Sequence, residues 1–121
     1  MRIIDKKMCD ALVVSRESAS LNNTIVTWHD GVGVMRLHGN QIARAVRMDH
    51  GHLDVYVQDG GYGASRTTAS RLNALFTTLQ VDWGVFIRKG SMYIGMSDGT
   101  TKLFAGWFRL PLYMRHAQQI R

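Results

Sequence analysis

This chain of 121 residues has few cysteines, prolines, acidic residues and long apolar runs. Each scarcity excludes some classes of protein. The single cysteine, Cys9, cannot form an internal disulfide, and no other residue has the spacing that would make it part of a zinc site. The apolar runs are too short for a membrane span, and residues 1–15 lack the apolar core of a signal peptide. We therefore expect a cytoplasmic protein with no membrane partner, no metal site and no cofactor.

Nine Asp and Glu residues against 15 Lys and Arg residues give a formal charge of +6 and a pI near 10.0, which favours acidic partners such as nucleic acid. The basic residues are scattered in ones and twos, so the charge serves solubility equally well. With 45% hydrophobic residues, the length suits a single domain over residues 1–121. Residues 1–23 predict a helix and a connector, and residues 109–121 predict a frayed basic tail.

Residues 24–57 predict four antiparallel strands, because turn signals separate short runs of β-type residues. We take Asp30-Gly31, Gly39-Asn40 and His50-Gly51 as two-residue hairpin turns. The resulting register places Met35 opposite Arg44, Val46 opposite Val55, and one apolar face on the meander. That face comprises Val26, Met35, Leu37, Ile42, Val46, Met48, Leu53, Val55 and Val57, with Arg44 as its one exception.

Two helices are predicted. The stronger one spans residues 67–80 and should lie on the apolar face of the meander, because its apolar residues recur at helical spacing. They are Leu72, Leu75, Phe76 and Leu79. A shorter helix over residues 5–14 starts with Asp5 as its N-cap and buries Met8 and Leu12, with Cys9 near them. Residues 16–23 predict a polar connector between this helix and the first strand.

After the main helix, Lys89-Gly90 and Asp98-Gly99 predict a second meander of three strands. Its register aligns Phe86, Tyr93 and Phe104 in a row beside Arg88 and Lys102. Aromatic rings next to positive charge on an open sheet are typical of surfaces that stack nucleic-acid bases. The alternatives are that the rings are ordinary core, or that the exposed sheet face mediates self-association.

The segment DGGYGASRTTASRLNALF leads from a glycine-rich loop into the main helix. Free N–H groups at a helix start suit an anion, and the candidates for binding one are Gly61, Gly63, Ser65, Thr67 and Thr68, with Arg66 adding charge. The segment lacks the lysine of a nucleotide-binding P-loop. The simpler interpretation is a turn that needs glycine, followed by Thr67 or Thr68 as the helix N-cap.

A second polar surface is predicted on the meander's other face, from Arg36, Arg47, Tyr56 and Gln58. Arg36 lies opposite Ala43 in the predicted register and keeps its guanidinium free, whereas Arg47 pairs with Asp54. A solvated face is the alternative. The pair His50 and His52 is more typical of a turn than of a metal site, and we find no nucleophile motif. We therefore expect no catalytic residues.

Four segments, NNTIV, RLHGNQIAR, TTASRLNALF and GVFIRKGSMYIG, together resemble small proteins encoded by tailed bacteriophages and prophages. The resemblance covers about residues 22–95. Its most specific pieces are LHGN at 37–40 and SRLNAL at 70–75. The chain departs from the pattern at Gly61-Tyr62-Gly63, where Gly-Trp is usual, and in its longer basic tail after Phe104. The resemblance implies that Arg71 and Asn73 have specific tasks, such as tying the glycine loop or the Gly39-Asn40 turn by hydrogen bonds.

The expected fold is α+β: a short N-terminal helix, a four-stranded antiparallel meander, a main amphipathic helix and a three-stranded antiparallel meander. The resemblance implies a non-enzymatic phage accessory protein, acting in the cytoplasm of an infected host. We expect a host protein as its partner, in a takeover or counter-defence role, and nucleic acid as the alternative. The expected contact residues are Arg36, Tyr56, Arg66, Arg71, Phe86, Arg88, Tyr93 and Lys102.

Overall fold

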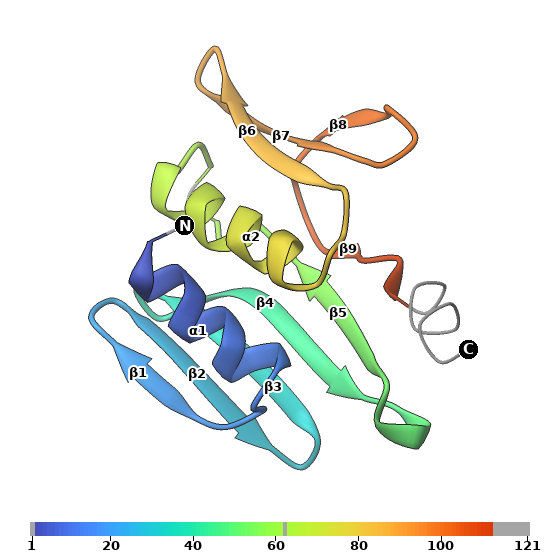
Figure 1. Cartoon of the computed structure of the whole chain (residues 1–121). Coiled ribbons are helices and arrows are strands. Elements are labelled where there is room, and N and C mark those ends of the chain that lie inside the picture. Colours follow the sequence, from blue (N-terminus) through green and yellow to red (C-terminus); the bar gives the residue numbers. More distant parts are fainter. Residues whose placement is uncertain (1, 62, 113–121) are drawn as a thin grey trace.

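The computed structural model describes residues 2–61 and 63–112, which form two antiparallel sheets and two main helices (Figure 1). The helices are α1 (Ile3–Val13) and α2 (Arg66–Thr78), with a short 3-10 turn, η1 (Asp49–Gly51). The strands are β1 (Ala19–Leu21), β2 (Thr24–His29), β3 (Val32–Leu37), β4 (Asn40–Arg47), β5 (Leu53–Val57), β6 (Gly84–Arg88), β7 (Ser91–Gly95), β8 (Thr101–Leu103) and β9 (Phe108–Arg109). The predicted α+β class is confirmed. No helix among the described residues is both long and apolar enough to cross a bilayer.

The larger sheet has six strands in the order β1-β2-β3-β4-β5-β9, and the smaller has the order β6-β7-β8. The predicted four-stranded meander forms the centre of the larger sheet. The predicted connector over residues 16–23 is wrong for Ala19–Leu21, because Asn22 adopts a positive φ of 54° and turns the chain back so that Leu21 pairs with Thr24. The predicted tail over residues 109–121 is likewise wrong at Arg109, which pairs with Tyr56 of β5; residues 113–121 lie outside the described part of the chain.

Only the first of the predicted registers in the larger sheet holds, with Val26 opposite Met35. The second turn is His38-Gly39, where both residues have positive φ, so Leu37 pairs with Asn40. A β-bulge then shifts the register at Met35, which pairs with Ala43 and not with the predicted Arg44. The extra residue at the bulge is Ile42.

The bulge changes which residues of β4 face the helices. Ile42, Ala43 and Ala45 are fully buried, whereas Arg44 is exposed and is no exception to the apolar face. At the far end η1 replaces a two-residue turn, so Val46 pairs with Asp54 and not with Val55. Val46 therefore shares the outer face with Arg44, and Met48 is 47% exposed.

In the smaller sheet, β6 and β7 pair as predicted, with Phe86 opposite Tyr93. The register of β7 with β8 is one residue from the prediction, because Met96 pairs with Thr100 through a backbone hydrogen bond and leaves a three-residue turn. Tyr93 consequently lies opposite Leu103, and Phe104 is buried beyond the end of β8.

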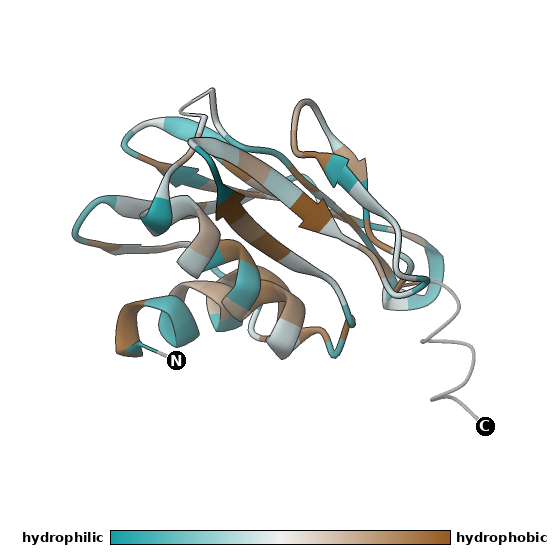
Figure 2. Ribbon diagram, turned by 90° about the horizontal axis from the view of Figure 1, so that it is seen from above, coloured by the Kyte–Doolittle hydropathy of each residue, from teal (hydrophilic) through white to brown (hydrophobic). Residues whose placement is uncertain are grey.

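Helix α2 contacts both sheets, through β4 and β6, and lies between α1 and the smaller sheet in Figure 1. Its side chains Leu72, Leu75 and Phe76 are almost completely buried, as the helical spacing predicts, and Leu79 is half-buried. Figure 2 shows apolar segments of the strands lying next to the helices, where the core forms. The predicted position of α2 against the meander is confirmed.

Helix α1 begins at Ile3, so Asp5 lies in its first turn and is not the predicted N-cap. The predicted apolar side is confirmed, because Met8, Cys9 and Leu12 are buried. Burial, with the nearby charge of Asp5, raises the pKa of the Cys9 thiol to about 12, so the thiol stays protonated.

A buried ion pair joins the two helices. Asp5 is 2% exposed and accepts hydrogen bonds from Arg71 of α2 and, at 2.7 Å, from the hydroxyl of Ser70. The Arg71 guanidinium also donates to Thr24 Oγ1 at 3.1 Å and to Asn23 Oδ1 at 3.3 Å. Arg71 therefore connects α1, α2 and the hairpin between β1 and β2.

The buried charges are stable only because they are paired. Burial alone would raise the pKa of Asp5, but hydrogen bonds from Ser70 and Arg71, the Arg71 charge and a hydrogen bond from Arg2 outweigh it and lower that pKa below 3.8. Removing one partner would leave the other charge buried without compensation, which typically costs about 3–5 kcal/mol. The pair therefore makes α1 an integral part of the core.

A second polar contact fixes the smaller sheet to α2. The side-chain amide of Asn73 donates from Nδ2 to the carbonyl of Val85 at 2.9 Å and accepts from the Val85 amide at 2.8 Å. It thus occupies both hydrogen-bonding groups of a β6 residue, as a neighbouring strand would. The task expected for Asn73 is therefore structural, although it ties a strand and not the glycine loop.

Replacing Asp5 with Asn should destabilise the protein by about 3 kcal/mol at neutral pH, because the Arg71 charge loses its partner. The lowered pKa of Asp5 means that its contribution is present above pH 3.8 and is lost as the pH falls through the folded-state value. Urea unfolding between pH 6 and pH 2 should show the gap between wild type and Asp5→Asn closing at acid pH. Asp10→Asn, on the exposed side of α1, is the control, and a gap independent of pH would contradict the assignment.

Replacing Asn73 with Asp should destabilise the protein by about 2 kcal/mol, because a carboxylate cannot donate to the Val85 carbonyl and is repelled by it. Thermal and urea unfolding measure the effect. Asn22→Asp makes the same chemical change in an exposed turn and should be nearly neutral. Equal losses in the two variants would show that the Asn73 contact does not hold β6.

Candidate binding surfaces

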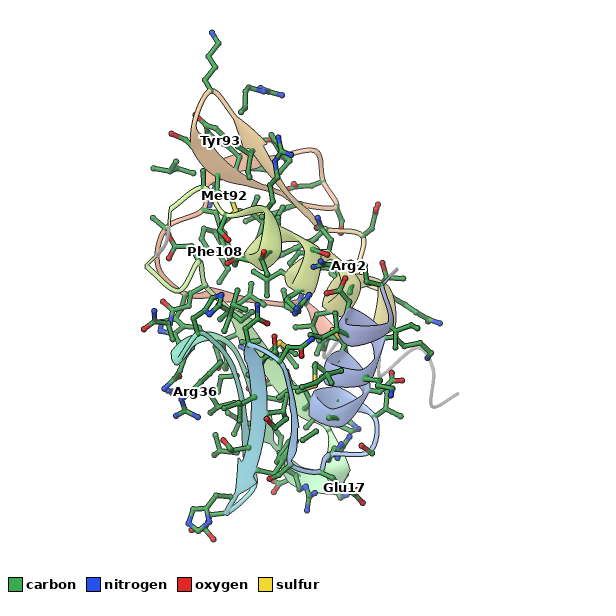
Figure 3. All side chains as sticks on the ribbon, turned by 90° about the vertical axis from the view of Figure 1, so that its left-hand side faces the viewer. Arg2, Glu17, Arg36, Met92, Tyr93 and Phe108 are labelled. Carbon is green, nitrogen blue, oxygen red and sulfur yellow. The ribbon has the colours of Figure 1, made fainter. Side chains whose placement is uncertain are left out.

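The first candidate surface is the face of the six-stranded sheet that α1 and α2 leave open. Direct cross-strand pairing aligns Arg44 of β4, Tyr56 of β5 and Arg109 of β9 in one row. Arg36 of β3 projects from the side of the sheet opposite α1 (Figure 3). Trp107 lies beside the row, with the guanidinium carbon of Arg44 5.3 Å from the centre of its ring. We call these five residues the basic face.

A hollow of about 520 Å³ lies at the basic face. Its described lining contains two guanidinium groups, one indole and the side-chain amides of three residues, but no carboxylate. The lining residues are Arg36, Gly39, Asn40, Gln41, Arg44, Gln58, Gly60, Gly61 and Trp107. The hollow therefore presents positive charge and neutral hydrogen-bonding groups to a ligand.

The arginines of the basic face are held in place but remain accessible. Arg36 donates to Thr27 Oγ1 at 3.2 Å, and Arg44 donates to Gln41 Oε1 at 3.0 Å. Each contact is with a neutral group, so neither neutralises the positive charge. The predicted position of Arg36 opposite Ala43 is wrong, because the turn at His38-Gly39 places it opposite Gln41.

The partner of Asp54 is Arg109 and not the predicted Arg47. The two side chains meet at 2.9 Å, and this hydrogen bond and the Asp54 charge raise the pKa of Arg109. Arg47 lies opposite Leu53, because η1 shifts the register by one residue. The Arg109 side chain is 58% exposed, so this surface pair adds little stability.

The second candidate surface is the outer face of the smaller sheet, where Phe86, Tyr93 and Leu103 lie directly opposite one another. The rings of Phe86 and Tyr93 stack with centroids 5.8 Å apart, and the Arg88 guanidinium lies 5.3 Å from the centre of the Phe86 ring. Leu103 is 57% exposed. We call Phe86, Tyr93 and Leu103 the outer column.

The predicted aromatic row is therefore divided. Phe104 belongs to the core, where it is 2% exposed and its ring centre lies 5.6 Å from that of Phe108. Met92 is buried on the inner side of β7, whereas Tyr93 follows it on the outer side (Figure 3). Lys102 lies opposite Ile94, so it belongs to the other side of the sheet from Tyr93, although it is exposed at the edge.

At the glycine loop the structure shows a capped helix. Ser65 is the N-cap of α2, with its hydroxyl accepting from the Thr68 amide at 3.2 Å, so the prediction of Thr67 or Thr68 as the cap is wrong. Thr68 is fully buried, and Thr67 is half-buried. Two of the five anion-binding candidates thus have roles in starting the helix.

The loop before the cap turns through glycines. Gly61 and Gly63 have φ values of 82° and 67°, a region that side chains disfavour. The Gly61 amide donates to Asp59 Oδ1 at 3.0 Å, so this group is already used within the loop. Both glycines are exposed.

Arg71 does not belong to a binding surface, although we expected it to contact a partner. It is 2% exposed, and its guanidinium is occupied by groups of the fold. It does not reach the glycine loop, but Asn23, which it contacts, accepts from the His38 amide at 2.9 Å and so borders the turn at Gly39. Arg66 is exposed at the start of α2 and does not line the hollow of the basic face.

His50 and His52 border a hollow of about 390 Å³ together with Asp49, Asp54 and Arg109. Among the described residues, no group of three or more His, Cys, Asp or Glu side chains is placed to hold a metal ion.

Sequence reasoning missed three residues of the basic face, Arg44, Trp107 and Arg109. Arg44 was assigned to the inner face because the bulge at Ile42 leaves no clear sequence signal. Trp107 and Arg109 reach the sheet through β9, which pairs with β5 over only two residue pairs. The nearest available signal is an aromatic and an arginine just before the one proline.

The fold and these two surfaces define a small α+β protein with an open basic sheet face and a column of two half-buried aromatic rings beside an exposed leucine. The chain matches the family model described as Kyanoviridae Gp96 protein over residues 1–109, and it belongs to that family of phage proteins. The phage origin implied by the sequence resemblance is therefore confirmed. Comparisons with curated proteins and with solved structures give no match.

Replacing Ser65 with Ala should lower the unfolding free energy by about 1 kcal/mol, because the Thr68 amide loses its cap. Urea unfolding measures this change. Ser20→Ala, on the exposed edge strand β1, is the matched control and should leave stability unaltered. Equal stability of Ser65→Ala and wild type would show that the hydroxyl does not start the helix.

Proposed function

We propose that this phage protein is a non-catalytic accessory protein that binds a host protein through the outer column, in the cytoplasm of the infected cell. Its role in this proposal is host takeover or counter-defence. The observation that carries the proposal is the exposure of Leu103 at 57%, beside two stacked aromatic rings. Phe86 and Tyr93 are half-buried, so the column forms a partly exposed apolar surface, and such surfaces mark interaction sites on soluble proteins.

The chemistry of the outer column also supports a protein partner. Aromatic residues and arginine contribute most of the binding energy at protein interfaces, and the column combines Phe86 and Tyr93 with Arg88. The stacked rings and the strand pairing hold these side chains in place before binding, which lowers the entropy lost on association. A rigid apolar centre with charge at its edge is the usual anatomy of an interface.

The charges around the column suggest the chemistry of the partner. Arg88 and Lys89 lie at the hairpin between β6 and β7, and both are exposed. A complementary surface therefore has an apolar centre with acidic residues at the rim that meets the hairpin. Such rim charges would speed association, whereas the apolar contacts would supply most of the affinity.

Replacing Leu103 with Lys should abolish capture of the host partner, because it places a charge on the most exposed apolar residue of the outer column without disturbing the core. The test is a pull-down from nuclease-treated host lysate, with fold integrity checked by thermal unfolding. Val14→Lys, which alters a residue 64% exposed beyond the end of α1, is the matched control and should retain capture. Capture should also persist at raised salt, because apolar contacts are little screened.

Three outcomes would contradict the proposal. The first is that no protein is captured from nuclease-treated lysate, and the second is that Leu103→Lys and Val14→Lys capture the same proteins. The third is a concentration-dependent dimer in sedimentation that Leu103→Lys dissociates, which would assign the column to self-association.

A further inference from the structure

We propose that the basic face is a separate binding surface for single-stranded nucleic acid. The inference does not depend on the host-protein proposal, because the basic face and the outer column lie on different sheets. It rests on the arrangement of arginine, aromatic and amide side chains at one hollow of the open sheet face.

Charged and aromatic side chains alternate along the row of the basic face. Tyr56 lies between Arg44 and Arg109 across three paired strands, and neighbouring strands are about 4.8 Å apart. Positive groups that track a phosphate backbone, with aromatic rings between them for the bases, are the shared feature of surfaces that bind single strands. The row therefore matches a chain of alternating phosphates and bases.

An exposed indole, that of Trp107, lies beside this row. Trp107 is 43% exposed while Arg44 lies against its ring, so part of the ring remains open to solvent. An aromatic ring in this position can stack on an unpaired base, and each such contact is typically strong whatever the base. In a duplex the bases stack on one another and are not available to the ring, which favours a single strand.

The hollow of the basic face is lined by amide and guanidinium groups. The side-chain amide of Gln58 offers a donor and an acceptor, and that of Gln41 offers a donor while its Oε1 accepts from Arg44; such groups suit the edges of splayed bases. Arg36 and Arg44 supply guanidinium groups that hydrogen-bond phosphate oxygens. An acidic peptide would use the arginines, and its backbone would pair with the amides, but acidic side chains have no ring to stack on the indole.

The charges of the chain and of the hollow's lining favour a negatively charged ligand. The chain carries a net charge of +6, and the described lining of the hollow includes no acid. Asp54 neutralises Arg109 in part, which leaves Arg36 and Arg44 as the main sites for phosphate. Phosphate contacts of this kind release counterions, so the binding should weaken steeply with salt.

The test measures fluorescence anisotropy of a labelled thymidine 15-mer at low salt and over a salt series. The double variant Arg36→Gln/Arg44→Gln should bind at least tenfold more weakly, and its log–log salt slope should be shallower by about 1.4, since each lost contact with single-stranded nucleic acid removes about 0.7. Trp107→Leu should bind roughly tenfold more weakly with an unchanged slope, because stacking involves no counterion. These two distinct signatures identify both kinds of contact.

Two matched controls test whether oligonucleotide binding depends on the basic face itself, and not on the overall positive charge or on the outer column. Arg66→Gln removes an exposed arginine at the start of α2 and should bind the oligonucleotide nearly as well as wild type. Leu103→Lys should retain oligonucleotide binding even where it loses the host partner, so the two proposals can fail separately. Thermal unfolding confirms that each variant is folded.

Four results would overturn the inference: no binding of the 15-mer at low salt, an equal loss in Arg66→Gln and in the double variant, tighter binding of the matching duplex, or unchanged affinity in Trp107→Leu. In a competition assay, poly-glutamate should displace the strand only weakly. Displacement at equal charge concentration would reassign the basic face to an acidic protein segment.

Discussion

The arrangement of this protein depends on the buried ion pair between Asp5 and Arg71, which are 66 residues apart in the sequence. A buried guanidinium is tolerated only if its hydrogen bonds and its charge are matched, and Arg71 meets this demand with groups from α1 and from the hairpin at Asn23 and Thr24. Apolar residues of both helices, such as Leu12 and Leu72, belong to one buried core. The ion pair therefore determines where α1 lies and how α2 faces the larger sheet.

Among the described residues, the placement of α1 and α2 leaves one face of each sheet uncovered by a helix. Helices α1 and α2 cover the inner face of the larger sheet, and α2 also contacts β6, which Asn73 ties down. The outer faces differ in chemistry because the alternation of β-strand residues delivers arginines and Tyr56 to one, and Phe86, Tyr93 and Leu103 to the other. The two proposed binding activities follow from this division, and neither requires the fold to change.

The elements could largely be predicted from the sequence, because hydrophobic periodicity and glycine turns are local signals. The main helix and the hairpins at Gly31 and Gly90 were predicted in this way. The cross-strand register could not be predicted in full. The bulge at Ile42 and the three-residue turn before Thr100 each add a residue without any local sequence signal. The basic face depends on that register, so Arg44 was assigned to the wrong side.

The role of Arg71 was beyond local reasoning for a different reason. An arginine inside an apolar helix indicates a specific task, but its partner Asp5 was explained locally as a helix cap. Tertiary packing brings these two distant residues together. The cost of burying each charge is balanced only when the other is present.

The most direct test of this account is a double-mutant cycle on the free energy of unfolding, using Asp5→Leu, Arg71→Met and the double variant. We predict that each single variant is strongly destabilised and that the double variant loses at least 2 kcal/mol less than the sum of the two, about the upper range for residues in contact. Additive losses would mean that the two side chains act independently, which would contradict the central place given to the pair.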